Sequence, residues 1–308
     1  MMNNSALNFI ALKKRLKMFV NKPILYFLRQ LISTRKGRSL FFSSLPKNEL
    51  LIAKTNEGLH YVVNSSDCNI GRSVFRDKIS FDSNNLLLAL KLIGSSRSIL
   101  IDIGANIGTV SILAISKELF TKCLAFEPEP NNFKILTANV VLNGLSEKFE
   151  LYNVALSNKL TESLCFELSK NNYGDHRVRV TDRQGLHAEH KRDTINVKVN
   201  TLDNACSSIN PDDCVIFMDA QGFEGHILCG AKNLVDAGVP LVTEFWPYGL
   251  LRSDGLDMFY SIMELANYTA MYDLRQPEKK LIFNIDGIRN IAKELGEDGA
   301  ADLVFIRQ

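Results

Sequence analysis

Hydrophobic residues follow two different patterns along this chain, one typical of helices and one of buried strands. From residue 84 onward the two patterns alternate. Segments with the apolar spacing of helices lie near residues 84–93, 108–119, 130–142, 223–236 and 255–266. Short apolar runs, typical of buried strands, lie near residues 98–103, 121–126, 148–155, 213–218, 239–245 and 302–307. This alternation predicts an α/β protein whose mostly parallel sheet is covered by helices on both faces.

Three segments add to this pattern. Residues 50–63 predict a hairpin with its turn at 56–58, so that residues 46–97 form an N-terminal hairpin and helix that cap a main domain over 98–308. Residues 281–285 predict a further strand or hairpin arm. Residues 169–194 are polar and charged between two β-like runs, and loops of this length are usually functional or disordered. We interpret them as an insertion with a substrate-side loop, a flexible surface insertion being the alternative.

A glycine-rich turn follows the first strand of the main domain. The run Ile99–Ile103 leads into Gly104, Asn106 and Gly108, and a helical segment comes next. Small residues let a ligand approach the backbone, and the start of a helix offers free N–H groups. The pattern predicts a cofactor site, with an ordinary tight turn as the alternative.

The sequence of this turn separates two classes of cofactor. Nicotinamide dinucleotides favour G-x-G-x-x-G, whereas residues 104–108 read G-A-N-I-G and lack the middle glycine. Asp102 lies inside the strand, where its carboxylate would repel a pyrophosphate. It suits a cationic ligand such as the sulfonium and ammonium of S-adenosylmethionine (SAM).

Two further strand ends contribute to this site. Glu127 ends the next apolar run, 25 residues after Asp102 and just before Pro128. A carboxylate there can accept hydrogen bonds from both ribose hydroxyls, because ligands of open parallel sheets bind at the carboxyl ends of the strands. The third run ends at Asn153, which predicts that Asn153, Val154 and Ala155 lie beside the adenine.

Composition and charge narrow the class of partner. Of 308 residues, 46% are hydrophobic and 23% charged, as in ordinary globular proteins. The formal net charge is +2, but residues 1–40 hold nine Lys and Arg and no acid, which leaves −7 over residues 41–308. This acidic body argues against a nucleic-acid partner. The six cysteines form no C-x-x-C pair and the five histidines no metal-ligand spacing, so we expect a cytoplasmic protein with no metal.

The N-terminal extension, residues 1–45, has its own pattern. Apolar and basic residues alternate over 6–33, which predicts two short amphipathic helices that divide near Pro23. The segment is too interrupted to span a bilayer or to serve as a secretory signal. Peripheral contact with an anionic membrane is one interpretation, and a capping helix or frayed extension is the other.

Five motifs occur in an order that resembles a known family. They are Asp102–Gly108, Phe126–Pro128, Asn153–Leu156, Thr201–Asp203 and Asp219–Glu224. Over residues 50–308 the chain resembles the FkbM-type methyltransferases, a branch of the class I SAM-dependent enzymes. The resemblance implies a Rossmann-like, doubly wound sheet of seven strands with the last antiparallel, and SAM as cofactor. The cofactor-binding candidates are Asp102, Gly104, Ala105, Asn106, Gly108, Glu127, Pro128, Asn153, Val154 and Ala155.

The resemblance also implies methyl transfer to oxygen, often a hydroxyl of a sugar, a glycan or a small metabolite. Asp219 follows the fourth strand and would face the transferred methyl, and Glu224 would begin the next helix, where a carboxylate is favoured. A general base helps a hydroxyl acceptor, and the candidates are, in order, Asp219, Glu224, His226 and His176. Glu244 and Trp246 would border the acceptor pocket. The substrate-side candidates are His176, Gln221, Glu244 and Trp246.

Two other functions stay open. A SAM-binding module without activity could use its basic N-terminus to dock on a membrane or a partner. Methyl transfer to nitrogen, including that of nucleic acid, is the second. Residues 219–222 read Asp-Ala-Gln-Gly and lack the two prolines of base N-methyltransferases.

Overall fold

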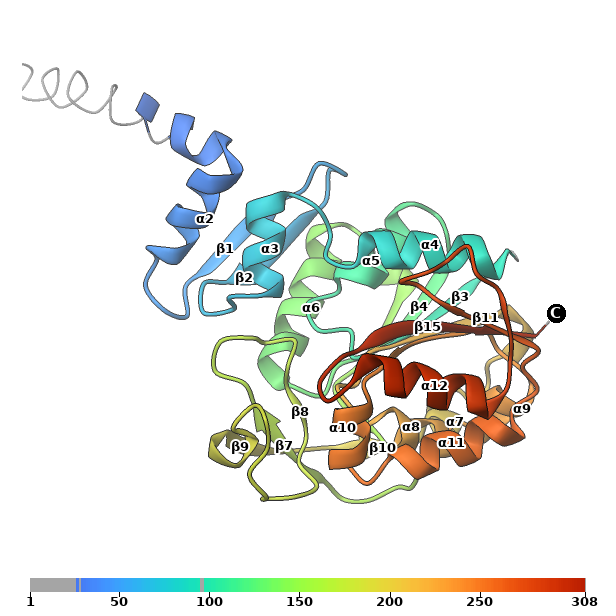
Figure 1. Ribbon diagram of the computed structural model, residues 1–308. Coiled ribbons are helices and arrows are strands. Elements are labelled where there is room, and N and C mark those ends of the chain that lie inside the picture. The colour runs from blue at the N-terminus through green and yellow to red at the C-terminus, as the bar shows by residue number, and fades with distance from the viewer. Residues whose placement is uncertain (1–25, 28, 95–96, 308) are drawn as a thin grey trace, which may run out of the picture.

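A computed structural model describes residues 26–27, 29–94 and 97–307, and these build a central sheet of eight strands in the order β14-β13-β15-β12-β11-β3-β4-β5 (Figure 1). β3, β4, β5, β11 and β12 run parallel, whereas β15 is antiparallel to both of its neighbours, β12 and β13. The bounds are β3 (Ile99–Ile103), β4 (Lys122–Phe126), β5 (Phe149–Tyr152), β11 (Cys214–Met218), β12 (Leu241–Phe245), β13 (Ala270–Asp273), β14 (Leu281–Ile282) and β15 (Ala301–Ile306).

Helices cover both faces of this sheet (Figure 1). One face carries α4 (Ser83–Ile93), α5 (Thr109–Ser116) and α6 (Pro130–Leu142), and the other carries α8 (Glu224–Cys229), α9 (Lys232–Asp236), α11 (Leu256–Leu265) and α12 (Ile285–Leu295). Alternate residues of a strand point to opposite faces. In β3, Leu100 accordingly packs with the α4–α5–α6 layer and Ile101 with the opposite layer. The predicted α/β class with a mostly parallel, doubly covered sheet is confirmed.

The elements differ from the prediction at a few places. The described sheet has eight strands and not seven, because the short β14 adds an antiparallel edge beside β13. The predicted strand 148–155 divides into β5 and β6 (Ala155–Leu156), since β6 pairs with β10 (Val199–Asn200) in a separate sheet. The predicted helix 223–236 divides at Gly230, where a Cβ would overlap the carbonyl oxygen of Ser157.

An N-terminal unit precedes the main sheet. β1 (Leu50–Lys54) and β2 (His60–Asn64) form an antiparallel hairpin beside α3 (Ile70–Asp77) and α2 (Arg35–Ser43). The hairpin is fixed to the main domain through α6, where Asn139 Oδ1 accepts a hydrogen bond from Val62 N at 2.6 Å. The predicted helices over 6–33 lie mostly outside the described residues. Within the described part of the chain, no helix combines the length and apolarity that a bilayer crossing requires.

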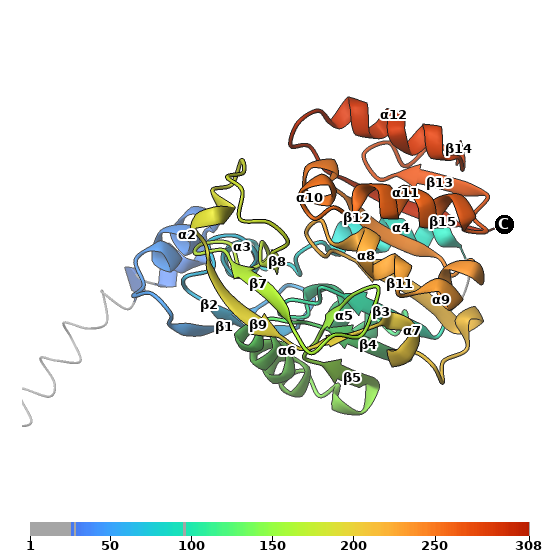
Figure 2. The same ribbon diagram turned by 90° about the horizontal axis from the view of Figure 1, so that it is seen from below.

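The predicted insertion contains a strand of its own. β7 (Leu164–Leu168), β8 (Arg177–Val178) and β9 (Asp193–Val197) form a small antiparallel sheet, which Figure 2 shows next to the N-terminal unit. Cys68 N donates a hydrogen bond to Asn171 O at 2.8 Å and joins the two. The insertion is therefore joined to the N-terminal unit. The remaining short elements are η1 (Ser146–Lys148), η2 (Glu189–Lys191), α7 (Leu202–Ala205), η3 (Pro211–Asp213) and α10 (Pro247–Arg252).

Candidate cofactor and active site

A cavity opens at the carboxyl ends of β3, β4 and β11, the edge at which open parallel sheets bind ligands. Its walls come from the glycine turn, the end of β4, the start of β6, the loop after β11 and the insertion. The predicted cofactor residues that line it are Asp102, Gly104, Ala105, Asn106, Glu127, Pro128, Val154 and Ala155. The fold thus brings together residues that are up to 53 positions apart in the sequence.

The glycine turn is held in its shape by backbone contacts. Gly104 has φ +79°, and the amides of Gly104 and Ala105 both donate to Phe126 O at 3.0 Å. A Cβ on Gly104 would overlap the carbonyl oxygen of Asp219, so only glycine fits between the two strand ends. Gly108 lies behind the cavity, where it precedes α5 and packs against Leu136.

Glu127 links the end of β4 to the glycine turn. Its Oε2 accepts a hydrogen bond from Asn106 N, and its Oε1 accepts one from Glu129 N, both at 2.8 Å. Each carboxylate oxygen has a second lone pair, which leaves capacity for two hydroxyl donors. Glu127 is only 5% exposed, and burial raises its pKa to about 8. Asn153 supports this turn from behind, because its Nδ2 donates to Glu127 O at 2.8 Å.

The charge of the cavity wall distinguishes between cofactors. Its charged side chains are Asp82, Asp102, Glu127 and Asp219, and the described residues that line it include no Lys or Arg. Asp102 is buried, its Oδ2 has no hydrogen-bond partner among the described residues, and burial raises its pKa to about 6. The charged lining residues that a pyrophosphate would meet here are all acidic. The residues present therefore fit a cofactor with a sulfonium and an ammonium group.

A strap from the insertion, residues 172–176, forms another part of the wall. Tyr173 O accepts hydrogen bonds from Asn106 Nδ2 at 2.8 Å and from Asn132 Nδ2 at 3.0 Å. Tyr173 N donates to Asp67 Oδ1 at 3.3 Å. The sequence analysis missed Asp67, Asn132 and Tyr173, because nothing in their local sequence shows that they meet.

His176 lies on this strap and lines the cavity. Ser169 N donates to its Nδ1 at 2.9 Å, so the neutral ring carries its hydrogen on Nε2. Burial lowers the pKa of His176 to about 4. At neutral pH this geometry makes His176 a hydrogen-bond donor.

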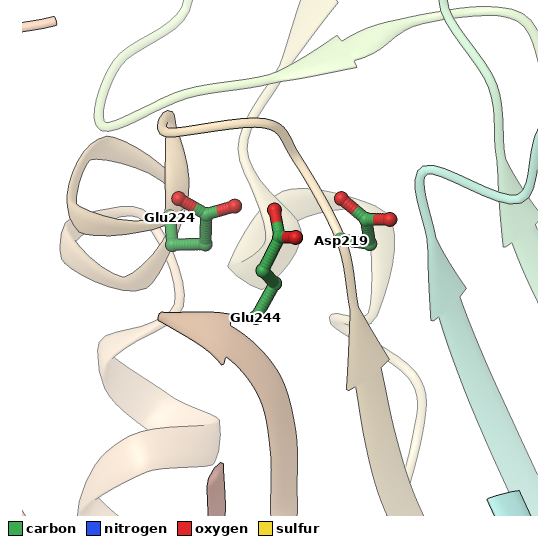
Figure 3. Close-up of side chains that lie close together, drawn as sticks. All are labelled: Asp219, Glu224 and Glu244. Atoms are coloured by element: carbon green, nitrogen blue, oxygen red, sulfur yellow. The ribbon is translucent and has the colours of Figure 1, made fainter. Parts of the chain in front are cut away.

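Three carboxylates meet beside the cavity (Figure 3). Asp219, Glu224 and Glu244 each offer an oxygen within 4.8 Å of the others. The Nε2 atom of Gln221 donates to Asp219 Oδ1 at 2.7 Å and to Glu244 Oε2 at 3.0 Å. Sequence spacing gave no sign of such an acidic cluster, because Glu244 comes from β12 while the other two follow β11.

Burial changes the acidity of this cluster. It raises the pKa of Glu224 to about 7 and that of Glu244 well above its usual range, and neighbouring carboxylates add to both shifts. Glu224 Oε1 accepts from Ala220 N at 2.9 Å and from Gly222 N at 3.2 Å. Glu224 therefore shapes the loop that presents Asp219 and Gln221 to the cavity.

Two predicted site residues have partners elsewhere. His226 Nε2 lies 2.8 Å from Ser253 O, and its ring stacks on Phe223 with centroids 4.2 Å apart. Trp246 is 6% exposed, and its indole N–H donates to Asp298 Oδ1 at 3.1 Å. The guanidinium of Arg177 lies 4.7 Å from the Trp246 ring centroid. The structure places neither ring in the cofactor cavity.

The fold and the cavity together define a class I SAM-dependent methyltransferase. The model of the methyltransferase FkbM domain matches residues 102–267, more than half of the chain. The chain belongs to the FkbM methyltransferase family, and its cofactor is SAM.

Solved structures with a similar fold have low sequence identity. An FkbM methyltransferase from Methylobacillus flagellatus is 15% identical with a TM-score of 0.39; the match covers 68% of this chain and 43% of that one. TYW2 of M. jannaschii, in complex with AdoMet, is 12% identical with a TM-score of 0.40, covering 86% and 89%. The tRNA m1G37 methyltransferase of M. jannaschii is 12% identical with a TM-score of 0.40, covering 86% and 56%. A search of curated proteins finds no match.

Proposed function

We propose that this protein transfers the methyl group of SAM to a hydroxyl oxygen of a sugar, a glycan or a small hydroxylated metabolite. The observation that carries the proposal is the cavity wall, whose charged side chains are carboxylates that extend from Glu127 to Asp219. Glu127 would bind the ribose hydroxyls, Asp102 would face the cationic part of the cofactor, and Val154 and Ala155 would lie beside the adenine.

The residues of the chain would act mainly by alignment. Bound SAM supplies a methyl carbon that its positive sulfur has already activated. Correct alignment and exclusion of water account for much of the rate of such a displacement. The contact between Gly104 and Asp219 fixes the cofactor turn relative to the loop of the proposed base, and the strap at Tyr173 forms part of the cavity wall.

Asp219 is the proposed general base. It lines the cavity, and burial raises its pKa, so its carboxylate takes up a proton more readily than an exposed one. Gln221 donates a hydrogen bond to its side chain and a second one to Glu244, and Glu224 positions its loop. His176 would donate a hydrogen bond to the bound molecules. His226 and Trp246 have other partners, Ser253 and Asp298, and take no part in the proposed chemistry.

The acidic side chains of the cavity wall also favour one kind of acceptor over another. A phosphate-bearing or nucleic-acid acceptor would have to approach carboxylates without a Lys or Arg among the described lining residues. The net charge of −7 over residues 41–308 would also repel a phosphate-bearing or nucleic-acid acceptor. A neutral polyol meets no such repulsion, which favours a sugar or small hydroxylated molecule. Peripheral membrane contact through residues 6–33 remains a separate proposal.

A transfer assay tests the proposal. Purified protein with labelled SAM should methylate at least one member of a panel of glycans and small hydroxylated metabolites, and leave RNA unlabelled. Asp219→Asn should lower turnover by about 10²–10⁴-fold, the range of general-base catalysis, while SAM still binds. Labelling of RNA alone would overturn the choice of acceptor. Full turnover by Asp219→Asn would overturn the assignment of the base.

A further inference from the structure

We propose that Asp219, Glu224 and Glu244 form a binding site for a divalent cation that prefers oxygen ligands, Mg²⁺ or Mn²⁺. The three residues come from different elements: the end of β11, the first residue of α8 and the end of β12. Figure 3 shows their carboxyl groups side by side, with that of Glu244 between those of Glu224 and Asp219.

The distances suit a single small ion. Each side chain offers an oxygen within 4.8 Å of the other two. Oxygen ligands lie about 2.0–2.1 Å from Mg²⁺, so ligands on opposite sides of the ion are about 4.2 Å apart. Side-chain movements of a few tenths of an ångström therefore let all three carboxylates reach one ion.

Glu224 supplies a second, independent observation. The residue is 0% exposed, and its Oε2 has no hydrogen-bond partner within the described part of the chain. The other oxygen, Oε1, is fixed by the amides of Ala220 and Gly222, which sets the orientation of the carboxyl group. A buried polar atom without a partner is costly, and a cation would supply the missing interaction.

The charge around the cluster supports the same conclusion. Among residues 26–27, 29–94 and 97–307, no Lys, Arg or His forms an ion pair with Asp219, Glu224 or Glu244. Asp302 lies opposite Glu244 in the β12–β15 register and adds another carboxylate. Gln221 contributes only an amide dipole. A divalent cation would supply the positive charge that no described side chain brings to the cluster.

The position of the ion suggests its role in methyl transfer, and this step rests on the proposed function. Asp219 and Gln221 line the cofactor cavity, so an ion bound by Asp219 would lie at its wall, within reach of a bound acceptor. An acceptor hydroxyl that binds the ion has a lower pKa. Its O–H bond breaks, and the proton passes to a carboxylate oxygen that the ion leaves free. The hydroxyl oxygen then bonds to the methyl carbon as the C–S bond breaks, which leaves a neutral sulfide.

Titration with Mn²⁺ alone tests the site. The full chain is treated with a chelator and desalted, and the electron paramagnetic resonance signal of free Mn²⁺ is followed during the titration. We expect one ion per chain, displaced by Mg²⁺. Asp219→Asn, Glu224→Gln and Glu244→Gln should each weaken binding by about tenfold or more, since metal sites lose this much even when only a supporting partner is removed.

Asp302→Asn is the matched control. It removes one negative charge next to Glu244 but no member of the cluster, so Mn²⁺ affinity should fall less than in the three cluster variants, because this partly buried charge acts on the ion without coordinating it. Melting curves establish that each variant is folded. The inference is overturned if the folded wild type leaves millimolar Mn²⁺ free, or if Asp302→Asn weakens binding as much as Asp219→Asn. The titration contains neither SAM nor acceptor, so its outcome is independent of the transfer assay.

Discussion

Gly104 and Asp219 touch through their backbones, which joins the cofactor turn to the loop that carries the proposed base. A Cβ on Gly104 would overlap the carbonyl oxygen of Asp219, and Asp219 N donates to Ile103 O at 2.9 Å. The two strands β3 and β11 are neighbours in the sheet, so this contact sits at their shared carboxyl edge. The cofactor turn and the loop that carries Asp219 are therefore fixed relative to each other by main-chain atoms.

Gly104→Ala should destabilise the protein strongly and abolish SAM binding. The positive φ alone costs about 1–3 kcal/mol for a non-glycine residue, and the overlap with Asp219 adds to it. Chemical denaturation measures the loss. Gly58→Ala is the control, because Gly58 has φ +87° but open space around its Cβ position. Equal losses of stability in the two variants would contradict the close contact.

Glu127→Gln should weaken SAM binding and lower stability. The amide group would turn an N–H donor toward the amide of Asn106 or of Glu129, which now donate to the carboxylate. Leaving one buried donor without an acceptor costs about 1–3 kcal/mol. Calorimetry with SAM and thermal melting measure the two effects. Glu147→Gln, at an exposed position, should change neither.

Asn132→Ala should loosen the strap over the cavity. The substitution removes one of the two side-chain hydrogen bonds to Tyr173 O, a loss of about 0.5–1.5 kcal/mol. Hydrogen exchange of residues 172–176 should become faster, and stopped-flow measurements should show faster release of SAM. Asn131→Ala, which changes the neighbouring residue, should leave both rates as they are. Unchanged exchange in Asn132→Ala would show that the hydrogen bond does not hold the strap.

The stability of the cofactor-free protein should fall as the pH rises from about 6.5 to 8.5. Burial raises the pKa of Asp82 to about 7, of Glu127 to about 8 and of Glu224 to about 7. In this window the unfolded chain has already lost these protons, so the folded state binds more of them. Stability then decreases with pH, by at most about 1.4 kcal/mol per pH unit for each group.

Below pH 6.5 the effect of His176 has the opposite sign. Its lowered pKa of about 4 makes stability rise as the unfolded histidine loses its proton. Melting temperatures measured across the pH range check both the fall in stability above pH 6.5 and the opposite effect of His176 below it. Glu127→Gln should show a shallower fall above pH 6.5. A melting temperature that rises through pH 8 would contradict buried, proton-binding carboxyls.

The sequence predicted those parts of the site whose positions follow from neighbouring residues in the chain. Asp102 and Glu127 each stand at the end of an apolar run, and parallel strands place such ends at one edge. Gly104 could be recognised in the sequence as part of a glycine-rich turn. The structure adds the reason, because the neighbouring strand end leaves no room for a side chain there. The order of β3, β4 and β11 in the sheet then suffices to bring these residues together.

The remaining features depend on pairings that local sequence does not encode. Glu244 joins Asp219 only because β12 pairs with β11. The surroundings of Trp246 could not be predicted for the same reason, because its ring faces Arg177, a residue 69 positions earlier in the sequence. β13 is four residues long and gives too short an apolar run to be recognised, whereas α12 has a clear helical spacing at Ile285, Ile288 and Ile291 that the sequence analysis did not use.

The most direct test of the central claim is a calorimetric titration of SAM into the wild type and Asp102→Asn. The account predicts one SAM per wild-type chain. It also predicts an affinity lower by about tenfold or more in the variant, a difference of about 1.4 kcal/mol, because an isosteric amide removes the buried charge that faces the cation. Equal SAM affinity in the two folded proteins would contradict the assignment of this cavity as a cationic cofactor site.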